Sequence, residues 1–150
     1  KNYKKALLNH ELYKQLSDSI LNKENIEKTI FRLQENKEIA AILALPAQTE
    51  QPVTGIVQNG TWYKGRIDRL AFDHEKKILH IIDYKSGSAQ SITQQKMQSY
   101  EQQLNIYAAL LCPLYPQYML QKNIIWIDAV DISGTYKSID YIQGVISGCN

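Results

Sequence analysis

A short apolar run at Ile78–Ile82, which ends in charged residues, constrains the fold of this chain more than any other stretch. Its length and β-branched residues predict a strand buried on both faces of a sheet. The run continues directly into Asp83, Tyr84 and Lys85. Burying an unpaired charge is costly, so charges at the end of a core strand are usually paired, bound to a metal or used in chemistry. Because side chains alternate along a strand, Asp83 and Lys85 are predicted to share a face, with Tyr84 pointing away.

A second acidic residue, Asp68, projects from the strand that is predicted before this one. If Asp68 faces the same side, two carboxylates and an ammonium group converge on one small volume. Neighbouring carboxylates repel each other and raise a pKa unless a cation lies between them, and Mg²⁺ prefers such oxygen ligands. A metal-bound water is more easily deprotonated, and Lys85 can orient it or stabilise charge on a phosphate. This pattern indicates metal-assisted hydrolysis of a phosphodiester.

The same residues also allow a purely structural interpretation. Asp83 and Lys85 would then form an ion pair at the end of the strand, and Asp68 would pair with Arg66 or Arg69. Structural ion pairs shift the pKa values of their groups, as catalytic sites do, so the spacing of these residues alone does not separate the two interpretations.

The rest of the chain predicts helices around an antiparallel meander. Asn59-Gly60 between strand-forming residues is a strong hairpin signal, because both residues tolerate positive φ. Helical spacing of leucine and isoleucine marks the helices, with Asn25 expected as an N-cap and Pro46 as a helix end. The predicted helices run to about Asn22, from Asn25 to about Pro46, and from about Gln94 to Leu111. The predicted strands lie at 53–58, 61–72, 77–84 and 123–130, with a short edge strand beyond Ser133-Gly134.

Length and charge narrow the class of protein. A chain of 150 residues predicts a single domain, 1–150, with a helical N-terminal part at 1–46 and a core at 50–131. A net charge of +2 gives no general basic field, so contact with nucleic acid would require a local patch. The chain shows neither a membrane span nor a secretory signal, and Cys112 and Cys149 lack metal-ligand spacing. We therefore expect no membrane contact and a cytoplasmic location.

Three motifs follow one another along the chain: Gly65-x-Ile67-Asp68-Arg69-Leu70, Ile81-Ile82-Asp83-Tyr84-Lys85 and Tyr100-x-x-Gln103-Leu104-x-x-Tyr107. In this order they resemble the RecB-type nuclease domain of the PD-(D/E)XK superfamily, and most of all the C-terminal nuclease of AddA-type recombination helicase-nucleases. The resemblance covers about residues 50–131. It implies an α/β restriction-endonuclease-like fold with a mixed central sheet flanked by helices. It also implies DNA as the substrate, Mg²⁺ or Mn²⁺ as the cofactor, and a role in double-strand break repair.

The resemblance also implies a role for individual residues. Asp68 and Asp83 match the two acidic metal ligands of the family, and the backbone carbonyl of Tyr84 matches a further ligand. Lys85 matches the catalytic lysine. The positions that match the family's motif for placing the DNA and the catalytic groups are Gln103 and Tyr107.

The chain departs from the family pattern in two respects. The family usually supplies another metal ligand, a histidine or glutamate, from a helix near the start of the domain. The candidates here are His10, Glu11 and Glu50, or a residue upstream of Lys1. There is also no phosphate-binding Gly-x-x-x-x-Gly-Lys loop, so no nucleotide cofactor is expected. Unwinding driven by ATP would require a helicase or an AddB-like subunit as a partner.

Two functions therefore remain in view. The first is an active metal-dependent deoxyribonuclease, which the presence of all five matched side chains favours. The second is a catalytically inactive remnant of such a nuclease that acts as a DNA- or protein-binding module, which the uncertain additional metal ligand favours.

Overall fold

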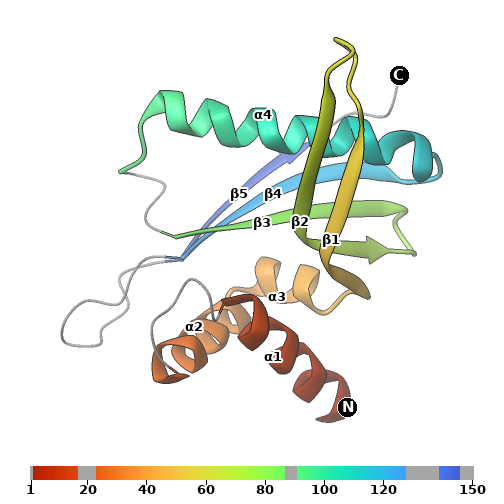
Figure 1. Ribbon diagram of the computed structural model, residues 1–150. Coiled ribbons are helices and arrows are strands. Elements are labelled where there is room, and N and C mark those ends of the chain that lie inside the picture. The colour runs from red at the N-terminus through yellow and green to blue at the C-terminus, as the bar shows by residue number, and fades with distance from the viewer. Residues whose placement is uncertain (1, 17–22, 87–90, 128–138, 146–150) are drawn as a thin grey trace.

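The computed structural model describes residues 2–16, 23–86, 91–127 and 139–145, and it shows an α/β fold built on one mixed sheet (Figure 1). The strand order is β1-β2-β3-β4-β5; β3 and β4 are parallel, and the other neighbours are antiparallel. The strands are β1 (Ala47–Ile56), β2 (Trp62–Asp73), β3 (Ile78–Ser86), β4 (Met119–Ile127) and β5 (Ile139–Val145). The helices are α1 (Asn2–Leu16), α2 (Lys23–Glu35), α3 (Lys37–Leu43), α4 (Gln94–Leu111) and the 3₁₀ turn η1 (Cys112–Leu114). The fold class predicted from the sequence is confirmed.

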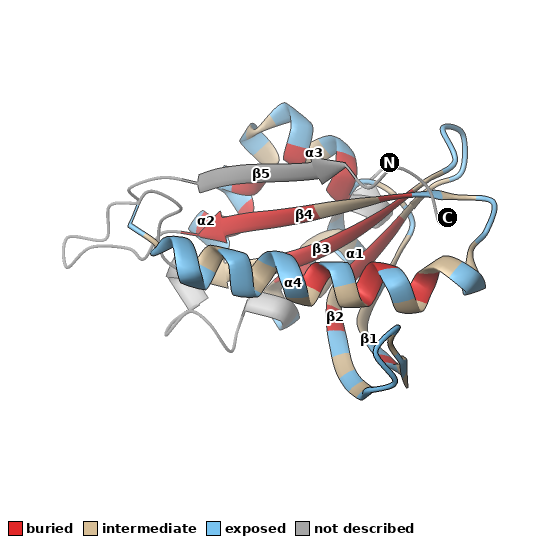
Figure 2. Ribbon diagram, turned by 90° about the horizontal axis from the view of Figure 1, so that it is seen from above, coloured by how far each residue is buried: buried red, intermediate tan, exposed pale blue. Residues whose placement is uncertain are grey.

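Helices cover both faces of the sheet, and the two sides have separate cores. On one face, Leu104 of α4 belongs to a buried cluster that includes Ile81. On the other face, Leu12 of α1 belongs to a cluster that includes Ile39 of α3 and Ile82. Ile81 and Ile82 are neighbours on β3, and both are fully buried. The central strand is therefore buried on both faces, as its sequence predicted, and red buried segments mark this in Figure 2.

The helix boundaries near the N-terminus differ from those predicted. Asn25 is not an N-cap, because α2 already begins at Lys23. The long second helix predicted from the sequence is instead two helices, since Asn36 caps α3 by accepting hydrogen bonds from the backbone N–H groups of Glu38 and Ile39. A side-chain oxygen that satisfies these backbone donors favours a new helix start over continuation. The predicted end of the first helix, near Asn22, lies outside the described residues.

The strands follow the predicted meander and extend it. The Asn59-Gly60 turn joins β1 to β2, with Gly60 at a φ of 78°. The first strand begins at Ala47 rather than at 53, and pairing runs from Ala47↔Ala71 to Ile56↔Trp62. The outer part of this hairpin projects beyond the sheet and past α4 (Figure 1). The last buried strand, β4, begins earlier than predicted, and the predicted residues 128–130 lie outside the described part of the chain.

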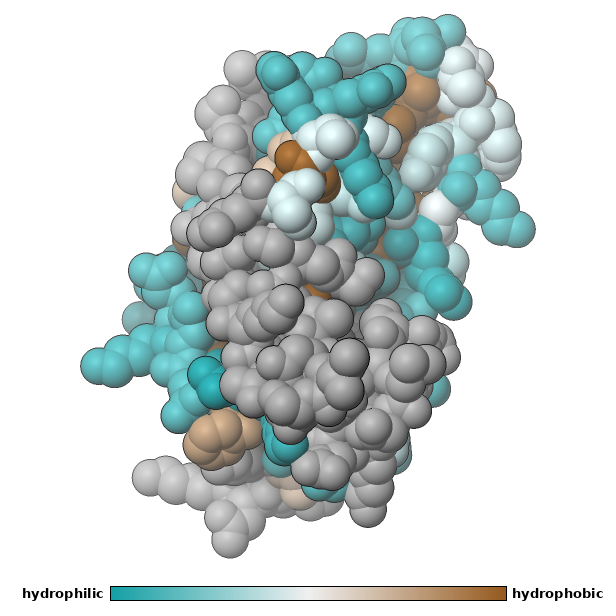
Figure 3. All heavy atoms as spheres, turned by 90° about the vertical axis from the view of Figure 1, so that its left-hand side faces the viewer, coloured by the Kyte–Doolittle hydropathy of each residue, from teal (hydrophilic) through white to brown (hydrophobic). Residues whose placement is uncertain are grey.

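None of the helices in the described residues combines the length and apolar character needed to cross a bilayer. On the face that Figure 3 shows, hydrophilic side chains predominate among the described residues, and the apolar ones form small patches.

Candidate active site

The end of β3 places Asp83 and Lys85 on the face that α4 covers. Lys85 Nζ lies 2.6 Å from Asp83 Oδ2, and Asp83 is 6% exposed. Tyr84, between them, packs its ring against the cluster beneath α1 and α3, on the opposite face. The predicted alternation is therefore present. The ion pair that the structural interpretation required is present as well, so this contact alone does not decide between the two interpretations.

Asp68 joins this pair through the backbone of β3. The ladder between β2 and β3 begins at Arg69↔Ile82, one residue after Asp68. Next to this pair, a side chain makes the contact between the strands: Asp68 Oδ2 accepts a 2.8 Å hydrogen bond from the backbone N–H of Tyr84. Asp68, Asp83 and Lys85 consequently line one pocket of about 500 Å³. The structure thus brings together the three charged residues that the sequence singled out.

The two carboxyl groups are held in an environment that disfavours their charge. Burial raises the pKa of Asp83, although the neighbouring Lys85 ammonium counteracts this effect. Burial also raises the pKa of Asp68; the Tyr84 N–H opposes the rise, and the charge on Asp83 adds to it. Asp83 Oδ2 is buried, and no donor reaches it at hydrogen-bonding angles despite the nearby ammonium. A divalent cation would compensate this charge, so the donor set fits Mg²⁺ or Mn²⁺.

Gln103 and Tyr107 of α4 border the same pocket and connect the helix to β2. Gln103 Nε2 donates to the Tyr107 hydroxyl at 3.0 Å, and that hydroxyl donates to the backbone carbonyl of Arg66 at 2.9 Å. Burial, followed by the neighbouring Tyr63, raises the pKa of Tyr107 to about 12, so the hydroxyl keeps its proton as a donor. A Cβ at Gly65 would lie 2.9 Å from the Tyr107 ring, so the glycine leaves room for this contact.

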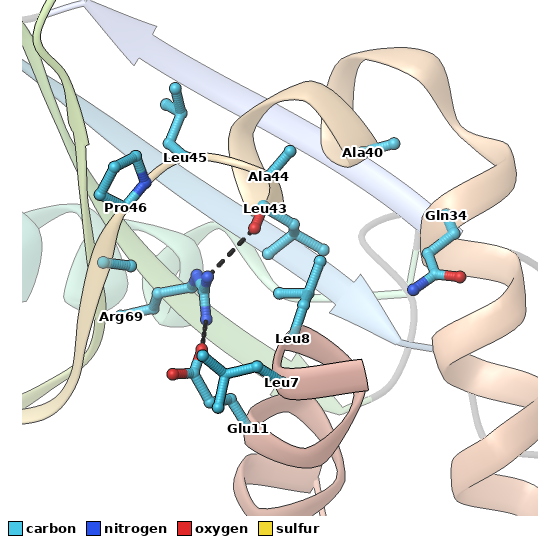
Figure 4. A pocket seen from close by; sticks show the side chains of 11 residues that line it. Leu7, Leu8, Glu11, Gln34, Ala40, Leu43, Ala44, Leu45, Pro46 and Arg69 are labelled. Carbon is cyan, nitrogen blue, oxygen red and sulfur yellow. Dashed lines mark hydrogen bonds and ion pairs between the residues drawn. The ribbon is translucent and has the colours of Figure 1, made fainter. Parts of the chain in front are cut away.

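The candidates for an additional metal ligand lie in different places. Glu11 points to Arg69 in a second pocket, on the face covered by α1 and α3 (Figure 4). His10 is exposed and is not among the residues that line the pocket of Asp68. Glu50 does line that pocket, although its carboxylate is bound 2.7 Å from Arg66 Nε. Among the described residues, no group of three His, Cys, Asp or Glu side chains could hold a metal ion. The additional ligand remains a prediction, with Glu50 the candidate inside the pocket.

Two features of this site were not found from the sequence. Lys85 Nζ lies 4.3 Å from the ring centroid of Tyr100, a residue to which the sequence analysis gave no role of its own. The signal was available, because Tyr100 precedes Gln103 by one helical turn. Glu50 has a φ of 52°, a left-handed backbone conformation that is uncommon for glutamate. Nothing in the local sequence indicates it.

Comparisons with known proteins identify the superfamily of this chain. The family model of the PD-(D/E)XK nuclease superfamily matches residues 4–140, so this chain belongs to that superfamily. None of the curated proteins compared with the chain matches it. Among solved structures, the crystal structure of SSO0001 is similar, with a TM-score of 0.44 and 18% sequence identity. The match covers 83% of this chain and 52% of that one, so this chain spans about half the length of that protein.

Proposed function

We propose that this chain is a metal-dependent deoxyribonuclease of the RecB or AddA type, which hydrolyses phosphodiester bonds in DNA with Mg²⁺ or Mn²⁺. Membership of the superfamily indicates a nuclease. The observation that carries the finer proposal is the meeting of Asp68, Asp83 and Lys85 in one pocket whose other wall holds Gln103 and Tyr107.

The residues of the pocket divide the work as follows. Asp68, Asp83 and the carbonyl of Tyr84 would hold the ion. When bound, it supplies Lewis-acid stabilisation of the phosphate and a water that is easily deprotonated. Asp83 anchors Lys85 through the 2.6 Å contact, so the ammonium is positioned to orient the water or to donate to a phosphate oxygen. Tyr107 fixes the β2 backbone at Arg66.

The wider setting follows from the same resemblance. A RecB or AddA type of nuclease would act in double-strand break repair, in the cytoplasm, beside a helicase or an AddB-like subunit. DNA is the partner that the pocket supports most directly, because the cationic residues Lys64 and Arg66 line it together with the two acids.

A cleavage assay tests the proposal. Purified protein is incubated with linear single- and double-stranded DNA in the presence of Mg²⁺, Mn²⁺ or EDTA. Cleavage is expected with either metal and not with EDTA. Lys85→Ala should reduce the cleavage rate by about 100-fold or more, the usual cost of removing a group that stabilises developing charge. Lys37→Ala, at an exposed position on α3, is the matched control and should cut at the wild-type rate. Equal rates for Lys85→Ala and the wild type would refute the mechanism.

The alternative is a catalytically inactive nuclease-fold module that binds DNA or protein. It is favoured by the lack of a three-residue metal cluster in the part of the chain that is described. This alternative predicts DNA binding without cleavage under every metal condition. Calorimetry with Mn²⁺ separates the two further, because an inactive module that lacks a metal ligand should bind the ion weakly or not at all.

A further inference from the structure

The outer part of the β1–β2 hairpin carries a row of exposed side chains, which we call the hairpin stripe: Trp62, Lys64 and Arg66. These residues alternate along β2 and therefore share a face. Trp62, at the tip, is 65% exposed. The residues opposite them on β1 are also exposed and carry no charge: Ile56, Thr54 and Pro52. Over the four residue steps from Trp62 to Arg66 the stripe extends roughly 13 Å.

The other face of the hairpin fixes the direction of the stripe. Tyr63 packs edge-on against Tyr107, with ring centroids 6.0 Å apart, and Gly65 lies against the same ring. The side chains of the stripe alternate with Tyr63 and Gly65, so they lie on the other face of the hairpin from the Tyr107 ring. At its inner end the stripe enters the candidate active site, since Lys64 and Arg66 line the pocket that holds Asp68 and Asp83. Two cationic residues thus lie between the exposed aromatic side chain at the tip and the two acids of the pocket.

We propose that the hairpin stripe binds single-stranded DNA, with a base stacked on Trp62 and phosphates held by Lys64 and Arg66, and that it guides the strand into the pocket. Proteins that bind single strands combine stacking aromatics with a cationic track along the backbone. An unpaired base offers the face on which Trp62 can stack, whereas a base in a duplex is already stacked. The proposal rests on the proposed nuclease function for the substrate that enters the pocket.

Charge complementarity favours DNA over a protein partner. A protein that docked on the tip alone would use Trp62 and Ile56, and it would have no need of cations beside an acid pair. DNA does need them, because Asp68 and Asp83 would otherwise repel the approaching phosphates. Arg66 already binds Glu50 through Nε, but a guanidinium has five N–H donors, so its terminal amino groups can still take a phosphate.

Binding is measured in EDTA, where no cleavage should occur, with the full chain and a labelled oligothymidylate. The chain has two tryptophans, and Trp126 is 3% exposed, so quenching of fluorescence by DNA would report on Trp62. By anisotropy, Trp62→Ala should weaken binding roughly 5- to 150-fold, the usual loss for one stacked base, while Trp62→Phe keeps most of the affinity. Phe31→Ala, which removes a ring that is 61% exposed on α2, is the matched control and should bind as the wild type does.

The cationic part of the stripe has its own measurement. Lys64→Ala should reduce the slope of log affinity against log salt by about 1, whereas Lys37→Ala should leave it unchanged. Wild-type affinity for Trp62→Ala, no DNA binding by the wild type, or equal competition by a duplex would each overturn the proposal. Loss of binding by the stripe variants, in a protein that never cleaves DNA, would support the stripe and refute the nuclease function. Cleavage by the wild type together with unchanged binding by Trp62→Ala would support the nuclease function and refute the role of the stripe.

Discussion

Asp68 and Arg69 are neighbours on β2, yet they serve opposite faces of the sheet. Asp68 reaches the polar pocket beneath α4, and Arg69 reaches a mainly apolar pocket of about 700 Å³ between α1, α3 and β1 (Figure 4). Arg69 is 1% exposed, donates from Nη2 to the carbonyl of Leu43 at 3.1 Å, and lies 3.4 Å from the Glu11 carboxylate. The Glu11 carboxylate and the Leu43 carbonyl partner its terminal nitrogens, whereas Nε is buried without a hydrogen-bond partner.

The acid pair on the other face is compensated less completely. Burial is the main cause of the raised pKa of Asp68, and the charge on Asp83 raises it further. The charge on Lys85 offsets these effects in part. A buried charge with a partner in the chain ties elements of the fold together, as Arg69 ties β2 to α1 and α3. Buried carboxylates that lack full compensation can accept an exchangeable cation. The difference between the two pockets therefore separates a structural charge from chemically available ones.

The largest effect is expected on metal binding in the polar pocket of Asp68 and Asp83. Asp83→Asn should weaken Mn²⁺ binding more than about 100-fold, because loss of a direct ligand exceeds the usual cost of losing an outer partner. The metal-free variant should be as stable as the wild type or more so, since the substitution removes a charge that burial disfavours. Calorimetry and thermal unfolding measure the two effects. Unchanged Mn²⁺ affinity would remove Asp83 from the metal site.

A substitution in the mainly apolar pocket of Arg69 should change stability and leave metal binding unchanged. Glu11→Gln leaves the buried guanidinium of Arg69 without its carboxylate and should lower the free energy of unfolding by about 2 kcal/mol. Because Glu11 lies in the other pocket, Mn²⁺ affinity and cleavage should not change. Urea unfolding gives the stability. A loss of metal affinity in this variant would instead place Glu11 among the metal ligands and would contradict the separation of the two pockets.

A smaller effect is expected at the contact between the hairpin and α4. In Gly65→Ala the new Cβ would lie 2.8 Å from the Tyr63 ring and 2.9 Å from the Tyr107 ring, which should cost about 1 to 2 kcal/mol of stability. It should also slow cleavage by displacing the Tyr107 hydroxyl from the carbonyl of Arg66. Gly55→Ala, where the Cβ meets the flexible end of Leu110, is the control and should be milder in both assays.

The smallest effect concerns pH. The pKa of Asp68 and that of Asp83 are raised above 3.8 in the folded state, so between 3.8 and the raised values the folded protein binds more protons than the unfolded one. Without metal, their contribution to stability therefore falls as the pH rises through this window. Saturating Mg²⁺ competes with those protons, so the increase in melting temperature caused by Mg²⁺ should be larger at pH 8 than at pH 5. Asp83→Asn should abolish most of this difference.

Much of the architecture was predictable because it depends on local patterns. The Asn59-Gly60 turn, the apolar strand before Asp83 and the helix from Gln94 to Leu111 were all predicted, and the last of these has the predicted bounds. The break at Asn36 was missed, since apolar spacing continues through it and only the capping bonds reveal a second helix. The division into a helical part at 1–46 and a core at 50–131 stays a prediction.

The sequence by itself determined which residues could carry the chemistry, because Asp83 and Lys85 follow an apolar strand that has no packing reason to end in charge and Asp68 lies on the strand before it. It also determined the alternation that separates Asp83 and Lys85 from Tyr84. The tertiary structure decided which charges meet. Arg66 forms an ion pair with Glu50, although its charge also acts to lower the pKa of Asp68, and Arg69 forms an ion pair with Glu11. Such pairings depend on the packing of distant segments, here α1 and β1 against β2, and nothing in the local sequence encodes it.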